Sequence, residues 1–448
     1  MNCWGAVFRP LSQTITDCFV FFRFAPNYRP FGALVYRAAF AVSGFNLRPL
    51  RILLLVILGL SVYVVYCFVR RLTLSREAAV LAALFASYHL EYWTLFFNTG
   101  MLYDIFCCFF YFCALVYYIR IRQSGRLLRW YEMLIFCGLY ILTLDSKELG
   151  VSLPVVICAW ELLFNPPALW LAGWRRFIAR ELLPVWVTGI MTAAFIVGRI
   201  MDPQGLAQLG GYKMRVSLPV YLDAAGHFLN QLFYAGGYFD AKRTEAFLLA
   251  LLLIAVLAGS RKLGFCWILF VVSILPVAFI EPRGLASAWI PFVGLVAYGA
   301  ISLVALRDAV LKLAGRLSWK PAAQVVLFLL AARFMVRVHG DVRVMYDAFQ
   351  PEYDSIQDFR LSFDRLCPEV RKGSRILFVS DPFGDNYNVL FLVHLMYGDS
   401  TTQVQQLFRL NPKPDAAALA AYDYVFDFKD GKLIRLDPAA YARTQAGF

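Results

Sequence analysis

Residues 50–71 read LRILLLVILGLSVYVVYCFVRR. The first 20 of these residues are almost wholly apolar, and the stretch ends in the basic pair Arg70 and Arg71. About 20 consecutive apolar residues are what a straight helix needs to cross the hydrocarbon core of a bilayer. The stretch therefore predicts a membrane-spanning helix with a basic end.

The composition of the whole chain extends this prediction. Of the 448 residues, 60% are hydrophobic and 16% are charged, whereas soluble domains carry about 25% charged residues. Disordered chains and small disulfide-stapled secreted domains are excluded because they do not hold so much apolar sequence. The sequence predicts an all-α polytopic membrane protein.

About ten apolar runs are long enough to cross a bilayer, if a few short ones are allowed. They lie near residues 50–69, 77–98, 101–119, 130–145, 149–164, 182–200, 245–260, 263–281, 286–306 and 321–338. The fourth and fifth runs are shorter than a straight span requires, and they flank the charged sequence Asp145–Glu148. This interruption of an otherwise apolar region marks it as a candidate site.

Basic residues predict the orientation of these spans. Clusters of Arg and Lys follow the first, third, fifth, seventh and ninth runs, and the alternate short loops are nearly uncharged. Basic loops are typically cytoplasmic. The predicted domains are therefore an extracytoplasmic, interfacial first loop at 1–49, a transmembrane helical domain at 50–339 with an outer loop at 201–244, and an extracytoplasmic domain at 340–448.

The C-terminal region predicts a small α/β domain. A β-run at Ser374–Ser380 precedes an apolar helix at Asn388–Tyr397. A hairpin follows, with strands at Tyr422–Phe428 and Leu433–Leu436 joined around Asp430–Gly431, a pair that favours two-residue turns. No phosphate loop or catalytic triad occurs in it, so a lid or packing module and an independent active site both stay open.

Two kinds of site are not indicated. The basic excess of the chain lies before the C-terminal domain, where it reports topology and lipid contact. The chain has no basic tail or base-stacking module, so no nucleic-acid partner is expected. None of the ten cysteines forms a CxxC pair or a Cys/His cluster, so no metal site of that kind is predicted.

Charged side chains inside apolar spans are energetically costly and mark candidate functional positions. Glu91 lies in the outer third of the second span beside His89, Asp104 lies one turn into the third, and Lys147 and Glu148 lie in the break between the fourth and fifth. Three hairpins thus bring carboxylates to the same predicted outer depth. By contrast, Glu77, Glu132, Glu161, Glu181 and Asp308 fall at cytoplasmic ends beside arginines and are interpreted as surface neutralisers.

Each candidate has a structural alternative. His89 and Glu91 could be a paired couple that locks two helices. Asp104 could cap the N-terminus of its helix. Lys147 and Glu148 could form a simple interfacial turn.

The first loop adds Asp17, Tyr28, Arg29 and Arg37. A basic patch at headgroup depth suits a lipid phosphate, and a facing carboxylate could accept a proton from an acceptor hydroxyl. Together these parts describe sugar transfer from a lipid-phosphate donor, with a basic residue stabilising the departing phosphate. Snorkelling of Arg29 and Arg37 to lipid headgroups is the alternative.

Several short motifs follow one another along the chain: Tyr28-Arg29-Pro30, Gly44-Phe45-Asn46, Asn98-Thr99-Gly100, Tyr103-Asp104, Ser146-Lys147-Glu148-Leu149-Gly150 and Pro154. In this order they resemble the C-type (GT-C) integral-membrane glycosyltransferases, and most closely their protein O-mannosyltransferase-like branch. The resemblance covers about residues 25–165, with general agreement in hydropathy to about residue 340.

The resemblance implies a polyprenyl-phosphate-linked sugar donor, a protein or glycan acceptor at the outer face of a bacterial inner (plasma) membrane, and hexosyl or pentosyl transfer with inversion at the anomeric carbon. By position, Asp104, Lys147 and Glu148 match the family's outer-face polar residues, and Arg29 matches its loop arginine.

These residues make up the predicted site. Asp104 and Glu148, with Asp17 as a third, are the predicted catalytic carboxylates, and Arg29 and Lys147 are the predicted phosphate contacts. The remaining predicted substrate-binding residues are Tyr28, His89 and Glu91. The carboxylates could hold Mg²⁺ or Mn²⁺, although nothing in the sequence requires a metal.

The chain departs from the family in its first loop. Family members begin with a span followed by an acidic pair that supplies the base, whereas residues 1–24 contain a single acid, Asp17. We expect an upstream first span to precede Met1. The alternative is a degenerate, non-catalytic relative that acts as a lipid-sugar carrier or partner subunit. An ion-coupled transporter is disfavoured because no inverted repeat is evident.

Overall fold

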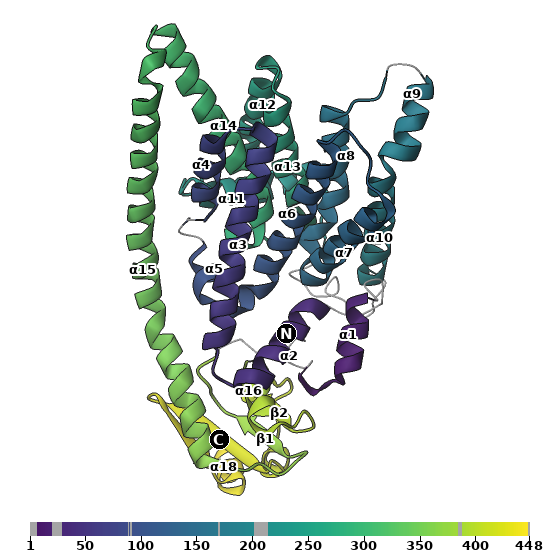
Figure 1. Ribbon diagram of the computed structural model, residues 1–448. Coiled ribbons are helices and arrows are strands. Elements are labelled where there is room, and N and C mark those ends of the chain that lie inside the picture. Colours follow the sequence, from purple (N-terminus) through teal and green to yellow (C-terminus); the bar gives the residue numbers. More distant parts are fainter. Residues whose placement is uncertain are drawn as a thin grey trace. The chain divides into compact units, whose positions relative to one another are not determined.

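The computed structural model describes residues 7–19, 29–87, 89, 92–168, 171–200, 214–383 and 388–446. The chain divides into two compact units (Figure 1). Ser12–Val342 is the helical unit, and Arg343–Phe448 with Met1–Leu11 is the tail unit.

The helical unit consists of helices joined by short connections. Its helices are α1 (Leu11–Phe19), α2 (Pro30–Ser43), α3 (Arg48–Thr73), α4 (Arg76–Ser87), α5 (Trp93–Phe97), α6 (Leu102–Arg122), α7 (Trp130–Ser146), α8 (Leu153–Phe164), α9 (Leu171–Arg176), α10 (Leu183–Ile200), α11 (Leu218–Leu232), α12 (Ala241–Leu257), α13 (Arg261–Ala278), α14 (Trp289–Leu313) and the first part of α15 (Lys320–Leu366). Short 3-10 segments, η3 (Thr99–Met101) and η4 (Glu148–Ser152), precede α6 and α8.

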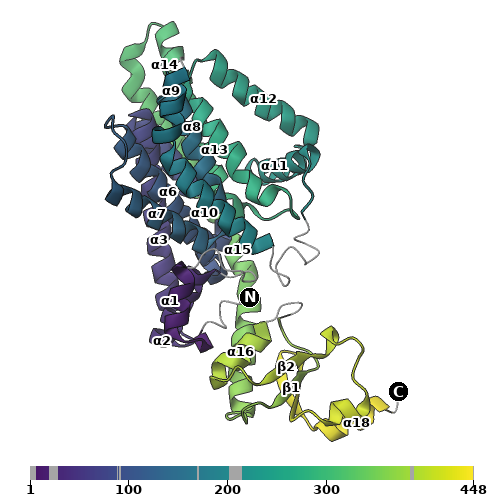
Figure 2. The same cartoon turned by 90° about the vertical axis from the view of Figure 1, so that its right-hand side faces the viewer.

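The core of this unit is a bundle in which α3, α4, α6, α13 and α14 run side by side (Figure 1). Helix α8 packs against α13 and α10 (Figure 2). Gly294 of α14 lets two helices approach closely, because a Cβ there would lie 2.8 Å from the backbone nitrogen of Phe270 in α13. The buried Trp289 donates from Nε1 to the Ala86 carbonyl at 3.0 Å and ties α14 to α4.

The described helices confirm an integral membrane protein. A helix lies at each of the ten predicted positions, and five helical segments are long and apolar enough to span a bilayer: Arg48–Thr73, Thr99–Arg122, Arg261–Ala278, Leu285–Leu313 and Leu317–Leu366. A bent pair, Gly173–Glu181 and Leu183–Gly198, makes a sixth if its 53° bend belongs to one span. The number of ten spans and their orientation stay predictions.

The charged interruption near residue 147 is a break between two helices. Helix α7 ends at Ser146, and Lys147 has an extended backbone with φ −160° and ψ 153°. The chain then forms η4 before α8 begins one residue ahead of Pro154, which is tolerated in a first helical turn. Gly150 packs against Thr143, whose Cγ2 would lie 2.6 Å from a Cβ at that glycine. The break therefore holds Lys147 and Glu148 at the end of the bundle.

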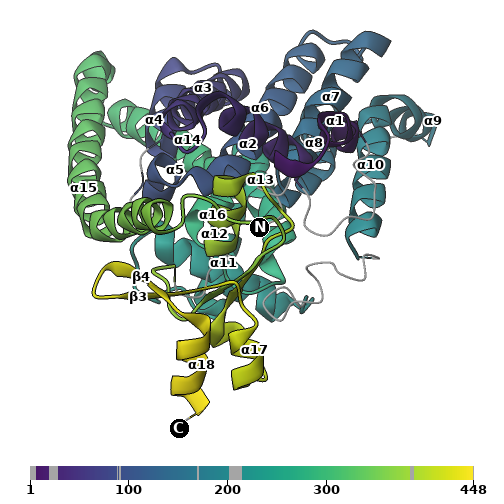
Figure 3. The ribbon, with the colours of Figure 1, turned by 90° about the horizontal axis from the view of Figure 1, so that it is seen from below.

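The first loop also forms helices. Helix α2 begins at Pro30, whose fixed φ suits a first helical turn. It ends at Gly44, whose φ of +54° is readily adopted by glycine and turns the chain toward α3. Helix α2 packs against α3 and α7, as seen from below in Figure 3. It thus meets the end of the bundle that carries the α7–α8 break.

The acids at the predicted cytoplasmic ends pair with arginines, but not all of them at the surface. Glu161 is fully buried and accepts hydrogen bonds from Arg122 Nε at 2.8 Å and Nη2 at 2.6 Å. Glu161 also accepts from the Tyr118 hydroxyl at 2.8 Å. The interpretation of Glu161 as a surface neutraliser is wrong, because the ion pair lies between packed helices.

The tail unit contains a four-stranded sheet in the order β2–β1–β3–β4. Its strands are β1 (Arg375–Phe378), β2 (Gln403–Gln406), β3 (Tyr424–Lys429) and β4 (Lys432–Leu436), and its helices besides the end of α15 are α16 (Asn388–Tyr397), α17 (Ala416–Ala420) and α18 (Pro438–Ala446). Strand β1 is parallel to β2 and β3, and β4 is antiparallel to β3. The predicted first strand, apolar helix and hairpin are confirmed, with positive φ at Asp430 and Gly431 in the turn.

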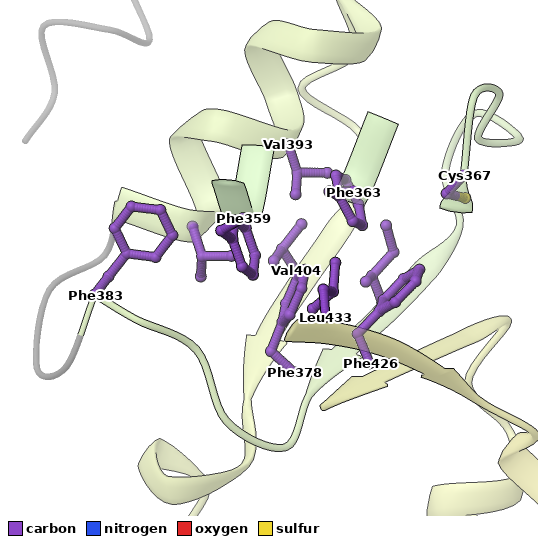
Figure 4. Close-up of a cluster of buried hydrophobic side chains, with 11 residues drawn as sticks. Phe359, Phe363, Cys367, Phe378, Phe383, Val393, Val404, Phe426 and Leu433 are labelled. Atoms are coloured by element: carbon purple, nitrogen blue, oxygen red, sulfur yellow. The ribbon is translucent and has the colours of Figure 1, made fainter. Parts of the chain in front are cut away.

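Helix α15 and α16 cover one face of this sheet. Phe359 and Phe363, four residues apart on α15, pack with Phe378 of β1 and Phe426 of β3 (Figure 4). All four side chains are fully buried. Residues of α15 beyond the predicted span at 321–338 are therefore helical because they complete the core of the tail unit.

Candidate functional site

Two ion pairs occupy the end of the helical unit where α2 meets the α7–α8 break. Arg29 Nη2 lies 2.9 Å from Glu148 Oε2, although the two residues are 119 positions apart. Lys147 Nζ pairs with Asp104 Oδ1. Arg29 precedes the first turn of α2, and Asp104 lies in the first turn of α6. Lys147 lies between α7 and η4, and Glu148 is the first residue of η4. Four of the eight predicted site residues are thus brought together.

The two pairs differ in accessibility. The side chains of Asp104 and Lys147 are 6% and 12% exposed, whereas those of Arg29 and Glu148 are 21% and 30% exposed. Asp104 does not cap its helix, because Met101 is the N-cap residue and the Asp104 carboxylate faces Lys147. Glu148 therefore has the more exposed side chain of the two acids, and that of Asp104 is buried.

An aromatic pair supports Arg29. Its guanidinium carbon lies 4.9 Å from the ring centroid of Tyr103, within the range of a cation–π interaction. The rings of Tyr36 and Tyr103 are 6.1 Å apart, and the Tyr36 hydroxyl donates to the Thr99 carbonyl at 2.9 Å. These contacts join α2 to η3 and the start of α6. They fix Arg29 to the elements that carry Asp104.

Electrostatics at Arg29 favour its charged form. Burial opposes the charge, but the carboxylates of Glu148 and Asp104 outweigh burial and raise the pKa of the Arg29 guanidinium. Asp104 thus acts on Arg29 as well as on Lys147. The two ion pairs form one electrostatic cluster of two cations and two carboxylates.

Asp17 lies near the same end of α7. It is 6% exposed in α1, next to Cys18. Burial, together with the charges of Asp145 and Asp17, raises the pKa of the Cys18 thiol to about 12. Because Asp145 is in the last turn of α7, α1 brings Asp17 toward the helix that ends beside Lys147.

His89 contacts a different set of elements. Its Nε2 lies 2.9 Å from the Leu232 carbonyl at the end of α11, and its ring stacks on Tyr234 at 4.8 Å with an interplanar angle of 3°. It is 4% exposed and also meets Phe292 of α14. These contacts join His89 to α11 and α14, and its pairing with Glu91 stays a prediction. Tyr28 and Glu91 lie outside the described residues.

Sequence reasoning missed two contributors to this site. Tyr103 was part of a motif but carried no predicted role, and Asp145 was noted in the charged break without being counted in the site. Asp145 is 1% exposed. The sequence feature that could have identified Tyr103 as a site residue is its position directly before Asp104, at the start of a predicted span.

The donor set gives limited support for a metal. Among the residues that the structure describes, no group of three or more His, Cys, Asp or Glu side chains could hold a metal ion. Asp104 and Glu148 each face a cationic side chain, which is the charge a metal would otherwise supply. Metal dependence stays a prediction.

Comparison with known protein families gives one match for this chain. A family model described as dolichyl-phosphate-mannose-protein mannosyltransferase matches residues 26–196. The matched segment contains both ion pairs, and Asp17 lies outside it. A search of curated protein sequences found no match.

The matches from a search of solved structures include two with TM-scores below 0.5. The archaeal oligosaccharyltransferase AglB from Archaeoglobus fulgidus, solved with an inhibitory peptide and a dolichol-phosphate, is 14% identical with a TM-score of 0.49, and the match covers 95% of this chain. The chain spans 65% of the length of AglB. ArnT from Cupriavidus metallidurans, in the apo state, is 15% identical with a TM-score of 0.45, and the match covers 88% of this chain and 79% of ArnT. The family model over residues 26–196 confirms the resemblance of this chain to the GT-C integral-membrane glycosyltransferases.

Proposed function

We propose that the chain transfers a sugar from a polyprenyl-phosphate-linked donor to a hydroxyl-bearing acceptor, a protein or a glycan, at the outer face of the membrane. The observation that carries this proposal is the cluster of two cations and two carboxylates formed by Arg29, Asp104, Lys147 and Glu148. Its members come from distant parts of the chain and meet at one end of the helical unit. The family match over residues 26–196 supports the donor class.

In this proposal Glu148 is the general base. It is the more exposed of the two carboxylates, and a base must come within hydrogen-bond reach of the proton that it accepts. Its carboxylate takes the proton of the acceptor hydroxyl while the hydroxyl oxygen attacks the anomeric carbon of the donor. The bond between that carbon and the phosphate oxygen breaks, and the configuration inverts. Polyprenyl phosphate leaves with the electron pair of the broken bond.

Arg29 is the proposed contact of the leaving phosphate. Its Nε is buried and has no hydrogen-bond partner among the described residues, so the guanidinium retains an N–H beyond the one that Glu148 occupies. Guanidinium groups bind phosphate through two parallel hydrogen bonds. A donor phosphate that binds Arg29 would compete with Glu148 for the guanidinium. The released Glu148 carboxylate could then accept the proton of the acceptor hydroxyl, so that binding of the donor would activate the acceptor.

Asp104 and Lys147 are proposed to position Arg29 and Glu148 and not to contact the acceptor. Removing one member of a buried ion pair leaves an uncompensated charge, so the pair holds the α7–α8 break in register with α6. Lys147 also adds positive charge close to the leaving phosphate. Asp17, which lies near the end of α7, is a weaker candidate for the base, because a matching family segment does not include it.

Sugar transfer by the purified full chain in lipid nanodiscs tests the proposal. The probes are polyprenyl phosphates linked to radiolabelled mannose or arabinose, representing a hexose and a pentose, with a membrane extract as the source of acceptors. We expect the wild type and the Asp240→Asn control to release polyprenyl phosphate and label an acceptor. Asp240 is 57% exposed, caps α12 and pairs with Arg243, which is not a member of the cluster. We expect the double variant Asp104→Asn/Glu148→Gln to release none.

A non-catalytic donor-binding protein is the second candidate. The observation in its favour is that both carboxylates of the cluster already face cations. It predicts that the wild type binds the polyprenyl-phosphate probes and leaves the sugar–phosphate bond intact with every acceptor fraction. Release of polyprenyl phosphate that depends on Glu148 would contradict it.

A further inference from the structure

A second arginine lies beside the candidate site and takes no part in its ion pairs. Arg51 is in the second turn of α3, and its Nη2 donates a long hydrogen bond of 3.5 Å to the Phe97 carbonyl at the end of α5. Within the described part of the chain, no carboxylate lies at ion-pair distance from Arg51. Among the described residues, its guanidinium has one hydrogen-bond acceptor, the neutral Phe97 carbonyl.

The guanidinium of Arg51 is also incompletely satisfied. Its Nε is buried and has no hydrogen-bond partner among the described residues. Leaving a buried donor of a charged group unpaired costs more than leaving a neutral one. The Nε of Arg51 therefore lacks an acceptor among the described residues, and the strongest acceptor for a guanidinium is an anion with two oxygens.

Arg51 and Arg29 are connected through one short segment. Phe97, which Arg51 contacts, is two residues before Thr99, whose carbonyl accepts from Tyr36. Two residues of extended chain span about 7 Å at most. Tyr36 in turn lies beside Tyr103, whose ring supports Arg29.

We propose that Arg51 is a second contact for the phosphate group of the donor, and that Arg51 and the buried Nε of Arg29 mark two ends of one anion-binding surface. The proposal rests on the proposed function. The ligand chemistry is a phosphate monoanion or dianion, and it could come from a lipid headgroup or from free phosphate. Two guanidinium groups would neutralise the two charges of a departing polyprenyl phosphate better than Arg29 alone, because Arg29 is shared with Glu148.

The alternative is a structural arginine that snorkels to headgroups and caps α5 through the Phe97 carbonyl. Arg48 separates the two explanations. It lies one turn earlier on α3, carries the same charge and has an exposed side chain that forms no ion pair with a described residue. Snorkelling predicts equal roles for the two arginines, whereas a built anion site predicts a role for Arg51 alone.

Phosphate binding by the full chain in nanodiscs of zwitterionic lipid tests the proposal. The ligands are polyprenyl phosphate and, in a separate arm, inorganic phosphate, and the variants are Arg51→Gln, Arg51→Lys and Arg48→Gln. We expect Arg51→Gln to weaken binding of polyprenyl phosphate about tenfold, since a charge-assisted hydrogen bond contributes that order of free energy. Arg51→Lys keeps the charge and the fold, and should bind between the wild type and Arg51→Gln. Arg48→Gln should bind as the wild type does.

The outcomes separate the two proposals. A loss in the polyprenyl phosphate arm alone assigns the site to a lipid headgroup, and a loss in both arms assigns it to any phosphate. Equal binding by Arg51→Gln and the wild type, or equal losses in Arg51→Gln and Arg48→Gln, would overturn the role of Arg51. A wild type that binds phosphate through Arg51 but transfers no sugar would overturn the proposed function and leave this site standing.

Discussion

The ring of Tyr103 occupies the space that a side chain at Gly32 would need. A Cβ at Gly32 would overlap Cε1 of Tyr103 and lie 2.9 Å from Cδ2 of Leu102. Because Tyr103 also lies beneath the Arg29 guanidinium, the close approach of α2 to α6 sets the position of that arginine. A glycine in the first turn of α2 thus determines where the first ion pair forms.

Gly32→Ala tests this relationship. We expect it to push α2 away from α6, and overpacking of this kind costs about 1–3 kcal/mol. Donor affinity should fall with it, because Arg29 would move from Tyr103 and Glu148. The measurements are thermal unfolding in nanodiscs and binding of polyprenyl phosphate. Gly59→Ala in α3 is the control, because nothing lies within 4 Å of its added Cβ. Equal donor binding by the two variants would show that the contact does not position Arg29.

Lys147→Met tests the buried pair with Asp104. Breaking a buried ion pair by removing one partner costs about 3–5 kcal/mol, because the remaining charge is uncompensated. We therefore expect a lower unfolding temperature than in the wild type. Adding Asp104→Asn should recover part of the stability while donor binding stays weak. If the double variant is no more stable than Lys147→Met, the two side chains are not energetically coupled.

Glu161→Gln provides a comparison at the other end of α6. Glu161 is fully buried and binds Arg122, so the variant leaves a buried guanidinium with less charge compensation. The unfolding temperature should fall, whereas KM for the donor at a permissive temperature should equal that of the wild type. About 27 Å of helix separate Arg122 from Asp104, at 1.5 Å per residue. A change in KM alone would show that this ion pair communicates with the candidate site.

Asp399 predicts a pH dependence in the tail unit. Hydrogen bonds from Thr401 and Thr402 hold the pKa of the Asp399 carboxyl well below its ordinary value of 3.8. A pKa lowered by folding stabilises the folded state above the unfolded pKa, and this stabilisation is lost as pH falls below about 4. We expect Asp399→Asn to be less stable than the wild type at neutral pH and to lose less stability on acidification.

Hydrogen exchange of tail-unit amides in the full chain measures this effect, after correction for the intrinsic pH dependence of exchange. Asp347→Asn is the control, because Asp347 is exposed on α15. Identical protection of the Gly373 and Thr401 amides in Asp399→Asn and the wild type at neutral pH would contradict the prediction.

The sequence predicted the parts of the fold that depend on local hydrophobicity. Helices lie at the predicted spans because apolar runs of this length have few other stable conformations in a membrane protein. Helix α16 has the predicted bounds, and Asp430–Gly431 forms the predicted turn. Strand β2 was missed because the sequence Gln403–Gln406 lacks apolar alternation, and its pairing with β1 decides its conformation.

The candidate site was only partly predictable, for a related reason. The charged break around Lys147 stands out in an apolar sequence, but its partners depend on the packing of distant helices. Nothing local indicates that Glu148 meets Arg29, or that Gly32 admits Tyr103. His89 is the opposite case. It stands out in the sequence as a histidine in a predicted span, but its contacts in the structure are with Leu232 and Tyr234 and not with the candidate site.

The rate of a single turnover in Glu148→Gln, compared with Asp104→Asn at saturating donor, tests the central claim most directly. A positioned general base contributes about 10²–10⁴-fold to such a rate, so Glu148→Gln should fall by at least about 100-fold while its donor affinity is retained. Asp104→Asn should lose mainly stability and donor affinity. A Glu148→Gln variant that transfers sugar at the wild-type rate would contradict the assignment of Glu148 as the base.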